Sequence, residues 1–206
     1  MASIMDLNTL GIAMGSAWLS GINLYATVLT LGLLQRWDFA HLPGDLSILG
    51  HTWVIVTAAC LFTLQFIADK IPAVDSVWDL IHTFIRVPAG AILAATAFAD
   101  FSPEVRMMAL LVGGGIALSS HGTKTATRLA ANTSPEPVSN VLLSLAGDGV
   151  TVGGSILAVS HPVVFISIVT VAVLVSLLLV HWIYRALKRL FLRQRQPGTP
   201  VAPAAR

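Results

Sequence analysis

Charged residues are scarce in this chain. Only 11% of the 206 residues are Asp, Glu, Lys or Arg, whereas about a quarter would be charged in a soluble domain of this size. Hydrophobic residues make up 55% of the chain, and the mean hydropathy is +0.81. This composition excludes an ordinary soluble globular protein and predicts a protein whose solvent is lipid.

Several other features are also missing. The single cysteine, Cys60, has no partner for an internal disulfide. The first ten residues, MASIMDLNTL, lack the basic segment and the small-residue cleavage site of a removable signal peptide. The sequence contains no HExxH, P-loop or GxSxG pattern, so the corresponding metalloprotease, nucleotide-binding and hydrolase sites are not predicted. We expect no cofactor and no bound metal, and an enzymatic role is the less favoured interpretation.

Six hydrophobic segments recur along the chain, each about long enough for a membrane-spanning helix. They cover residues 8–34, 52–69, 77–98, 105–130, 139–159 and 162–184. We therefore predict an all-α, polytopic membrane helix bundle with six spans, which forms a single integral domain over residues 1–184. Pro88 falls inside the third segment, where it removes a helical hydrogen bond, and it is expected to kink this span.

Basic residues are concentrated at the end of the chain. Six of the twelve Lys and Arg residues lie in residues 185–206: Arg185, Lys188, Arg189, Arg193, Arg195 and Arg206. A basic segment beside the last span predicts a cytoplasmic C-terminus, and six spans would then place the N-terminus in the cytoplasm too. We expect residues 185–206 to form a disordered tail that contacts anionic lipid headgroups. Because the cluster adjoins a span, nucleic-acid binding is not expected.

Parts of the sequence echo one another. GSAWLSGINLYAT (15–27) aligns without gaps to GIALSSHGTKTAT (115–127), and LQFIAD (64–69) aligns to LSLAGD (143–148). In the six-span scheme both pairs run in opposite directions, as the inverted repeats of many transporters do. However, AGAILA (89–94) and GGSILA (153–158) would run in the same direction. The echoes therefore leave two interpretations open, an inverted repeat and chance similarity.

Ionisable residues lie inside the predicted spans. In DSVWDLIHTFIR, Asp75, Asp79, His82 and Arg86 are spaced i, i+4, i+7 and i+11, which places them on one helix face. Asp148 lies about as deep in the fifth segment as Arg86 does in the third. Because a charge facing hydrocarbon costs about 2.5–3.5 kcal/mol on insertion scales, we predict that Arg86 and Asp148 point inwards and pair.

Further polar residues extend this pattern. The candidate pathway or substrate-binding residues are Asn23, Asp69, Lys70, Asp75, Asp79, His82, Arg86, His121, Lys124, Arg128 and Asp148. Carboxylates and cations of this set are expected to neutralise each other near the inner face and to line a hydrated interior. In the alternative interpretation, buried charges fix helix register, and Ser, Thr and Asn side chains only hold helices together.

Three functions are compatible with this pattern. The leading interpretation is a small channel or transporter for an anionic solute or a phosphate-bearing lipid, working as a homo-oligomer because six short spans make a thin bundle. Arg86 and Asp148 would form a pair in mid-membrane, and His121, Lys124 and Arg128 an inner vestibule. The alternatives are a membrane scaffold or assembly factor, and a lipid-phosphate enzyme.

Two stretches of the chain resemble a known family. ADKIPAVDSVWDLIHTFIRVPAG and SHGTKTATRLAAN…SNVLLSLAGD are similar to a bacterial family of small multi-pass membrane proteins, domain of unknown function number forty-one twenty-six. The matching positions are Asp69, Lys70, Pro72, Asp75, Arg86, Pro88, Gly90, His121, Lys124, Arg128 and Asp148. The resemblance implies the bacterial inner membrane but no activity. This chain has Gln65 and Gly147 where the family commonly carries acids, which argues against a proton- or cation-coupled role.

Overall fold

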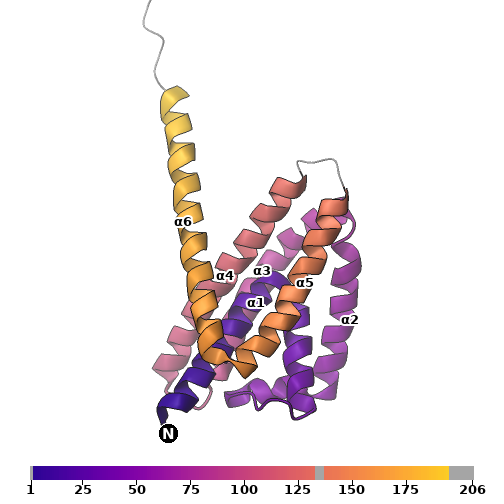
Figure 1. Ribbon diagram of the computed structural model, residues 1–206, viewed down its shortest axis with the longest axis vertical. Coiled ribbons are helices and arrows are strands. Elements are labelled where there is room, and N and C mark those ends of the chain that lie inside the picture. Colours follow the sequence, from indigo (N-terminus) through magenta and orange to yellow (C-terminus); the bar gives the residue numbers. More distant parts are fainter. Residues whose placement is uncertain (1, 133–136, 195–206) are drawn as a thin grey trace, which may run out of the picture.

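The computed structural model is all-α, and it describes residues 2–132 and 137–194. Side chains are described except at positions 2–6, 72, 73, 75–77, 79, 129–132, 137–140, 183, 184 and 186–194. The described elements are α1 (Ala2–Arg36), the 3-10 helix η1 (Gly44–Gly50), α2 (Thr52–Ala68), α3 (Pro72–Ala97), α4 (Pro103–Asn132), α5 (Pro137–Ser160) and α6 (Pro162–Gln194) (Figure 1). The predicted all-α class is confirmed.

The helix α1 turns back on itself in the middle of the bundle. The backbone of Asn23 is non-helical (φ −148°, ψ 98°) and divides α1 into two half-helices. Gly11 in the first half packs against Pro162, and Gly32 in the second half packs against the carbonyl of Leu49. Both ends of α1 therefore lie at the lower end of the bundle as drawn in Figure 1.

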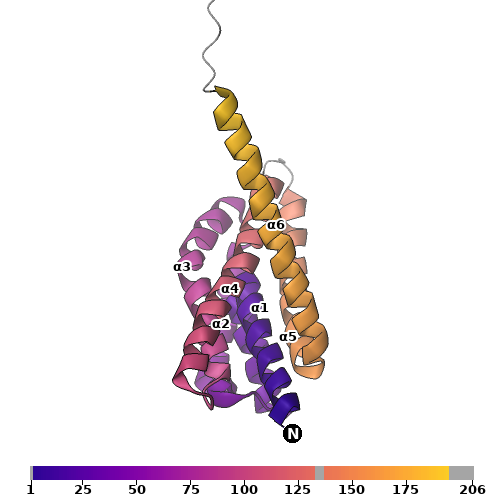
Figure 2. The same ribbon diagram turned by 90° about the vertical axis from the view of Figure 1, so that its left-hand side faces the viewer.

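The five longer helices that follow η1 alternate in direction. The lower end contains the start of α1 and the α5–α6 turn, and the upper end contains the α2–α3 turn and the end of α6 (Figures 1 and 2). The start of α1 and the end of α6 thus lie at opposite ends. The prediction of two cytoplasmic termini is not confirmed, and α1 ends at the same end of the bundle at which it begins (Figure 1).

The number of predicted spans is not confirmed. Four helices contain segments long and apolar enough to cross a membrane, in α1, α3, α5 and α6, and the bent pair η1–α2 is a fifth candidate. The predicted fourth span, in α4, falls outside this set of described helices. Pro88 lies inside α3 as predicted. A non-helical residue inside a described helix occurs in α1, at Asn23.

The inverted repeat is not confirmed either. The first half of α1 and the echoing part of α4 run in the same direction. Gly21 packs against the backbone of Ala117 and the hydroxyl of Ser120, and the next residue, Ile22, contacts Lys124 further along α4. The sequence scheme reversed this pair because it took α1 to be a complete span.

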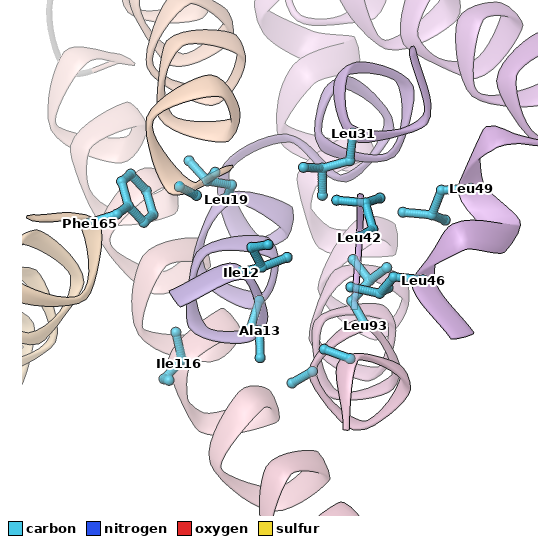
Figure 3. Close-up of a cluster of buried hydrophobic side chains, with 14 of the residues drawn as sticks. Ile12, Ala13, Leu19, Leu31, Leu42, Leu46, Leu49, Leu93, Ile116 and Phe165 are labelled. Atoms are coloured by element: carbon cyan, nitrogen blue, oxygen red, sulfur yellow. The ribbon is translucent and has the colours of Figure 1, made fainter. Parts of the chain in front are cut away.

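Apolar side chains fill the lower half of the bundle around the two halves of α1. Ile12 from the first half and Leu31 from the second belong to one cluster with Leu46 of η1, Leu93 of α3 and Phe165 of α6 (Figure 3). Each of these side chains is at most 7% exposed. This packed region holds the hairpin of α1 in place and leaves its tip, Asn23, among polar groups above.

The last helix continues into the predicted tail. The helix α6 extends to Gln194, so residues 185–194 are helical rather than irregular. Positions 195–206, the rest of the predicted tail, lie outside the described residues. Most of the apolar surface of α6 is exposed, including Leu178 at 68% and Trp182 at 69%. Such a helix requires an apolar solvent, which supports a membrane protein.

Candidate functional site

The tip of the α1 hairpin is a helix break stabilised by one side chain. Asn23 Oδ1 accepts a hydrogen bond from the backbone N–H of Ala26 at 3.0 Å, so Asn23 is the N-cap of the second half-helix. The hydroxyl of Thr27 donates to the carbonyl of Asn23 at 2.8 Å. Asparagine is among the residues most favoured at N-caps, which explains locally why the chain breaks at this position.

Two ionisable side chains from other helices meet this break. Lys124 Nζ of α4 donates to the carbonyl of Ile22 at 3.0 Å. This carbonyl ends the first half-helix, where a cation is favoured by the unsatisfied backbone carbonyls. Asn23 Nδ2 donates to Asp148 Oδ1 of α5 at 2.8 Å. The other carboxylate oxygen, Oδ2, is buried and has no hydrogen-bond partner among the described residues.

Asp69 joins the end of α2 to the same group of residues. Its Oδ2 lies 3.0 Å from Arg128 Nη2 and 3.7 Å from Lys124 Nζ, and its Oδ1 accepts from Arg128 Nη1 at 3.4 Å. Asp69 is 1% exposed and Arg128 is 5% exposed. We call Asn23, Asp69, Lys124, Arg128 and Asp148 the central network. It connects α1, α4, α5 and the end of α2.

Arg86 lies beside a histidine. Its Nη1 is 3.4 Å from His121 Nδ1, and the Arg86 side chain is fully buried. Because a guanidinium can only donate, His121 Nδ1 is the acceptor, and its Nε2–H donates to Thr83 Oγ1 at 2.7 Å. These contacts describe a neutral His121 that orients the arginine between α3 and α4.

His82 forms a separate aromatic contact group. Its Nδ1 lies 2.8 Å from the carbonyl of Trp78, which can only accept, so Nδ1 carries the hydrogen. In the neutral ring, Nε2 then accepts from the hydroxyl of Tyr25 at 3.0 Å. The Trp78 ring stacks on His82 with the ring centroids 4.5 Å apart. This arrangement ties the second half of α1 to α3.

The structure brings together many of the predicted site residues, but with different partners. Asp148 pairs with Asn23 and not with the predicted Arg86, because the tip of α1 reaches Asp148. Lys70 donates to the carbonyl of Phe66, four residues earlier, at 2.9 Å. The side chains of Asp75 and Asp79, which began the predicted stripe, lie outside the described residues.

Sequence reasoning missed two contributions to the site. The backbone carbonyl of Ile22 can accept from Lys124 because α1 breaks at Asn23. Gln65 of α2 is fully buried, and neither polar atom of its side chain has a hydrogen-bond partner among the described residues. The signal in the sequence was that the family commonly carries an acid where this chain has Gln65. Nothing in the periodicity of α2 distinguished Gln65 from a lipid-facing residue.

Buried hydroxyl side chains have a simpler role than the charged groups. Ser16, Ser20 and Ser120 donate to the carbonyl three residues earlier in their own helices, and Thr151 and Ser155 donate to the carbonyl four residues earlier. Such bonds satisfy each hydroxyl locally and allow helices to approach closely. They favour the interpretation that these Ser and Thr side chains serve helix contacts.

Two cavities lie beside the polar residues. The first has a volume of about 380 Å³ and lies between α1, α4, α5 and α6. The second has a volume of about 500 Å³, lies between the second half of α1, α2 and α3, and is almost entirely apolar. Lys124 and Arg128 of the central network line the first cavity, so this cavity can bring an anion to both cations.

Comparison with known proteins gives one match. A family model described as "Domain of unknown function (DUF4126)" matches residues 10–182, which extends from the first half of α1 to the exposed apolar part of α6. No curated protein and no solved structure matches the chain.

Proposed function

This chain belongs to the family described as Domain of unknown function (DUF4126), and we propose that it is a small membrane transporter for an anionic solute. The central network is the proposed binding site, and the break in α1 is the proposed moving part. One observation carries this proposal: Lys124 and Asp148 from two other helices contact the two broken ends of α1.

The cost of the buried charges supports a functional role. Each ionised group inside a membrane protein costs several kcal/mol unless it is compensated, and well-packed apolar residues often hold helices together equally well. Asp69, Arg86 and Arg128 are nevertheless each at most 5% exposed. A site for a charged solute gives these residues a purpose that a scaffold does not require.

The broken helix supports transport more specifically. Non-helical backbone at membrane depth occurs where it is buried in protein or lines a cavity. Many transporters bind substrates and ions at such half-helix ends. In this chain the end of the first half-helix is contacted by Lys124, which also lines the cavity of about 380 Å³.

We further propose an orientation in the bacterial inner membrane. In this scheme α2 to α6 cross the membrane, and α1 enters and leaves from the lower side. The basic residues Lys70 and Arg185 belong to the upper end, which is therefore the cytoplasmic side. The exposed Trp37 and Trp53 lie at the lower end, at the outer interface. The N-terminus then faces away from the cytoplasm.

A flux assay tests the proposal. Purified protein is reconstituted into vesicles, and two anionic cargos are followed in parallel: radiolabelled inorganic phosphate across the membrane, and a fluorescent anionic phospholipid between leaflets. Lys124→Gln is expected to lower the rate for the transported cargo by at least about tenfold, because one charge-assisted contact is worth about 1.5–3 kcal/mol. The matched control, Arg106→Gln, removes an exposed cation at the lower end and should leave the rate unchanged. If neither cargo moves faster than in protein-free vesicles, the transporter proposal is wrong.

A further inference from the structure

The cavity beside the central network has two chemically different parts. Among the described residues that line it, Lys124 and Arg128 carry positive charge and none carries a carboxylate. Hydroxyl groups lie next to the cations, and apolar side chains form the remaining wall. The hydroxyl residues are Ser120, Thr123, Thr127 and Ser176, and the larger apolar residues are Ile22, Leu143, Val150, Val175 and Leu179.

The charged part lies well inside the bundle. Lys124 is eight residues from the end of α4 at Asn132, which corresponds to about 12 Å along the helix. In the proposed orientation, with the end of α4 at the headgroup level, an anion bound there would lie about 12 Å below the headgroups. A site at this depth suits a molecule that is passing through the membrane.

The apolar part opens sideways. Val150 of α5 and Val175 and Leu179 of α6 are between 48% and 49% exposed although they line the cavity. The helices α5 and α6 are close at the lower end and separate towards the upper end in both views (Figures 1 and 2). Ser176 on α6 remains linked to Thr123 on α4 by a 2.9 Å hydrogen bond. A chain lying between α5 and α6 would therefore contact protein on one side and lipid on the other.

We propose that the solute is an amphiphile with an anionic phosphate or carboxylate head and an apolar chain, and that it enters sideways between α5 and α6. The head binds at Lys124 and Arg128, and the chain lies along Val150, Val175 and Leu179. A purely aqueous anion would not require this apolar wall, and a neutral lipid would not require the two cations. The inference rests on the proposed function and specifies its substrate class. The cavity volume of about 380 Å³ falls in the usual range of about 300–1,000 Å³ for small-molecule sites.

Tryptophan quenching tests this proposal because Trp18 lines the cavity. The full chain is held in a neutral maltoside detergent and titrated with dodecyl phosphate carrying a bromine in mid-chain, which quenches an adjacent indole. We expect saturable quenching that is lost in Trp18→Phe. Inorganic phosphate at the same concentration should not compete, and brominated dodecanol should give no saturable quenching. Lys124→Gln should weaken the dodecyl phosphate affinity about tenfold, which corresponds to 1.4 kcal/mol.

A second variant tests the same binding site if Lys124→Gln does not fold. Ala146→Leu enlarges an exposed side chain that lines the cavity and should weaken dodecyl phosphate binding while leaving Lys124 intact. Equal competition by inorganic phosphate would identify a free anion as the ligand, and equal quenching by brominated dodecanol would identify an apolar groove only. Either result overturns the amphiphile proposal.

The outcomes also separate this inference from the transporter proposal. Flux of inorganic phosphate without saturable dodecyl phosphate binding would retain transport and reject the amphiphile. Saturable binding of dodecyl phosphate without movement of either cargo in vesicles would retain the site and reject transport.

Discussion

Asp69→Asn is expected to lower the free energy of unfolding by about 3–5 kcal/mol, because it leaves two buried cations without their shared carboxylate. Asp69 is 1% exposed and contacts both Arg128 and Lys124. The asparagine retains the shape of the side chain, so lost packing contributes little to the change. Unfolding is measured by titrating sodium dodecyl sulfate into mixed micelles and following helix content.

A matched substitution separates this effect from a general loss of charge. Asp38→Asn removes a carboxylate whose partner, His41, is 3.4 Å away, with both side chains more than 80% exposed. Exposed pairs contribute little, and asparagine tolerates the positive φ of 61° at this position. The control should therefore unfold like the unmodified protein. Adding Arg128→Gln to Asp69→Asn should recover part of the loss, and no recovery would count against the ion pair as its cause.

Asn23→Ala is expected to cost about 2.5–4 kcal/mol. The substitution removes the N-cap of the second half-helix, worth about 1 kcal/mol, and the hydrogen bond to the Asp148 carboxylate, worth about 1.5–3 kcal/mol. The two interactions use different atoms of one amide group, Oδ1 for Ala26 and Nδ2 for Asp148. The same titration with sodium dodecyl sulfate measures the loss.

An exchange of the two side chains tests whether this geometry is the cause. The double variant Asn23→Asp with Asp148→Asn retains a capping oxygen at position 23 and restores a hydrogen bond with donor and acceptor reversed. It should be more stable than Asn23→Asp alone, in which two carboxylates face each other. Simple addition of the two single effects would show that these residues do not interact.

The sequence predicted the helical class correctly, and it predicted that Arg86 points into the bundle, because composition and spacing indicate both. Arg86, Asp69 and Arg128 are all buried, as the cost of exposing charge to hydrocarbon requires. Their pairing was harder to predict. Which helix faces meet depends on how the helices rotate and pack, and the side chain of Asn23 reaches Asp148 only because α1 turns back beside α5.

The turn itself was missed because hydropathy does not record it. Apolar residues continue on both sides of Asn23, and Leu7–Arg36 together have the composition of a membrane span. Length was the neglected signal: the predicted segment 8–34 would be about 40 Å long as a continuous helix, more than the roughly 30 Å of hydrocarbon. Gly21 and Asn23, both poor helix formers, lie at the break that divides this length into two half-helices.

The helix α1 enters and leaves the bundle on the same side, which brings its broken ends to the charged residues. Single cysteines at Ser3→Cys, Phe39→Cys and Arg185→Cys, each in a Cys60→Ser background, test this arrangement by labelling with a membrane-impermeant maleimide in right-side-out and inverted vesicles. Positions 3 and 39 should label from one face and position 185 from the other. Labelling of positions 3 and 39 from opposite faces would mean that α1 crosses the membrane, and would rule out the hairpin of α1.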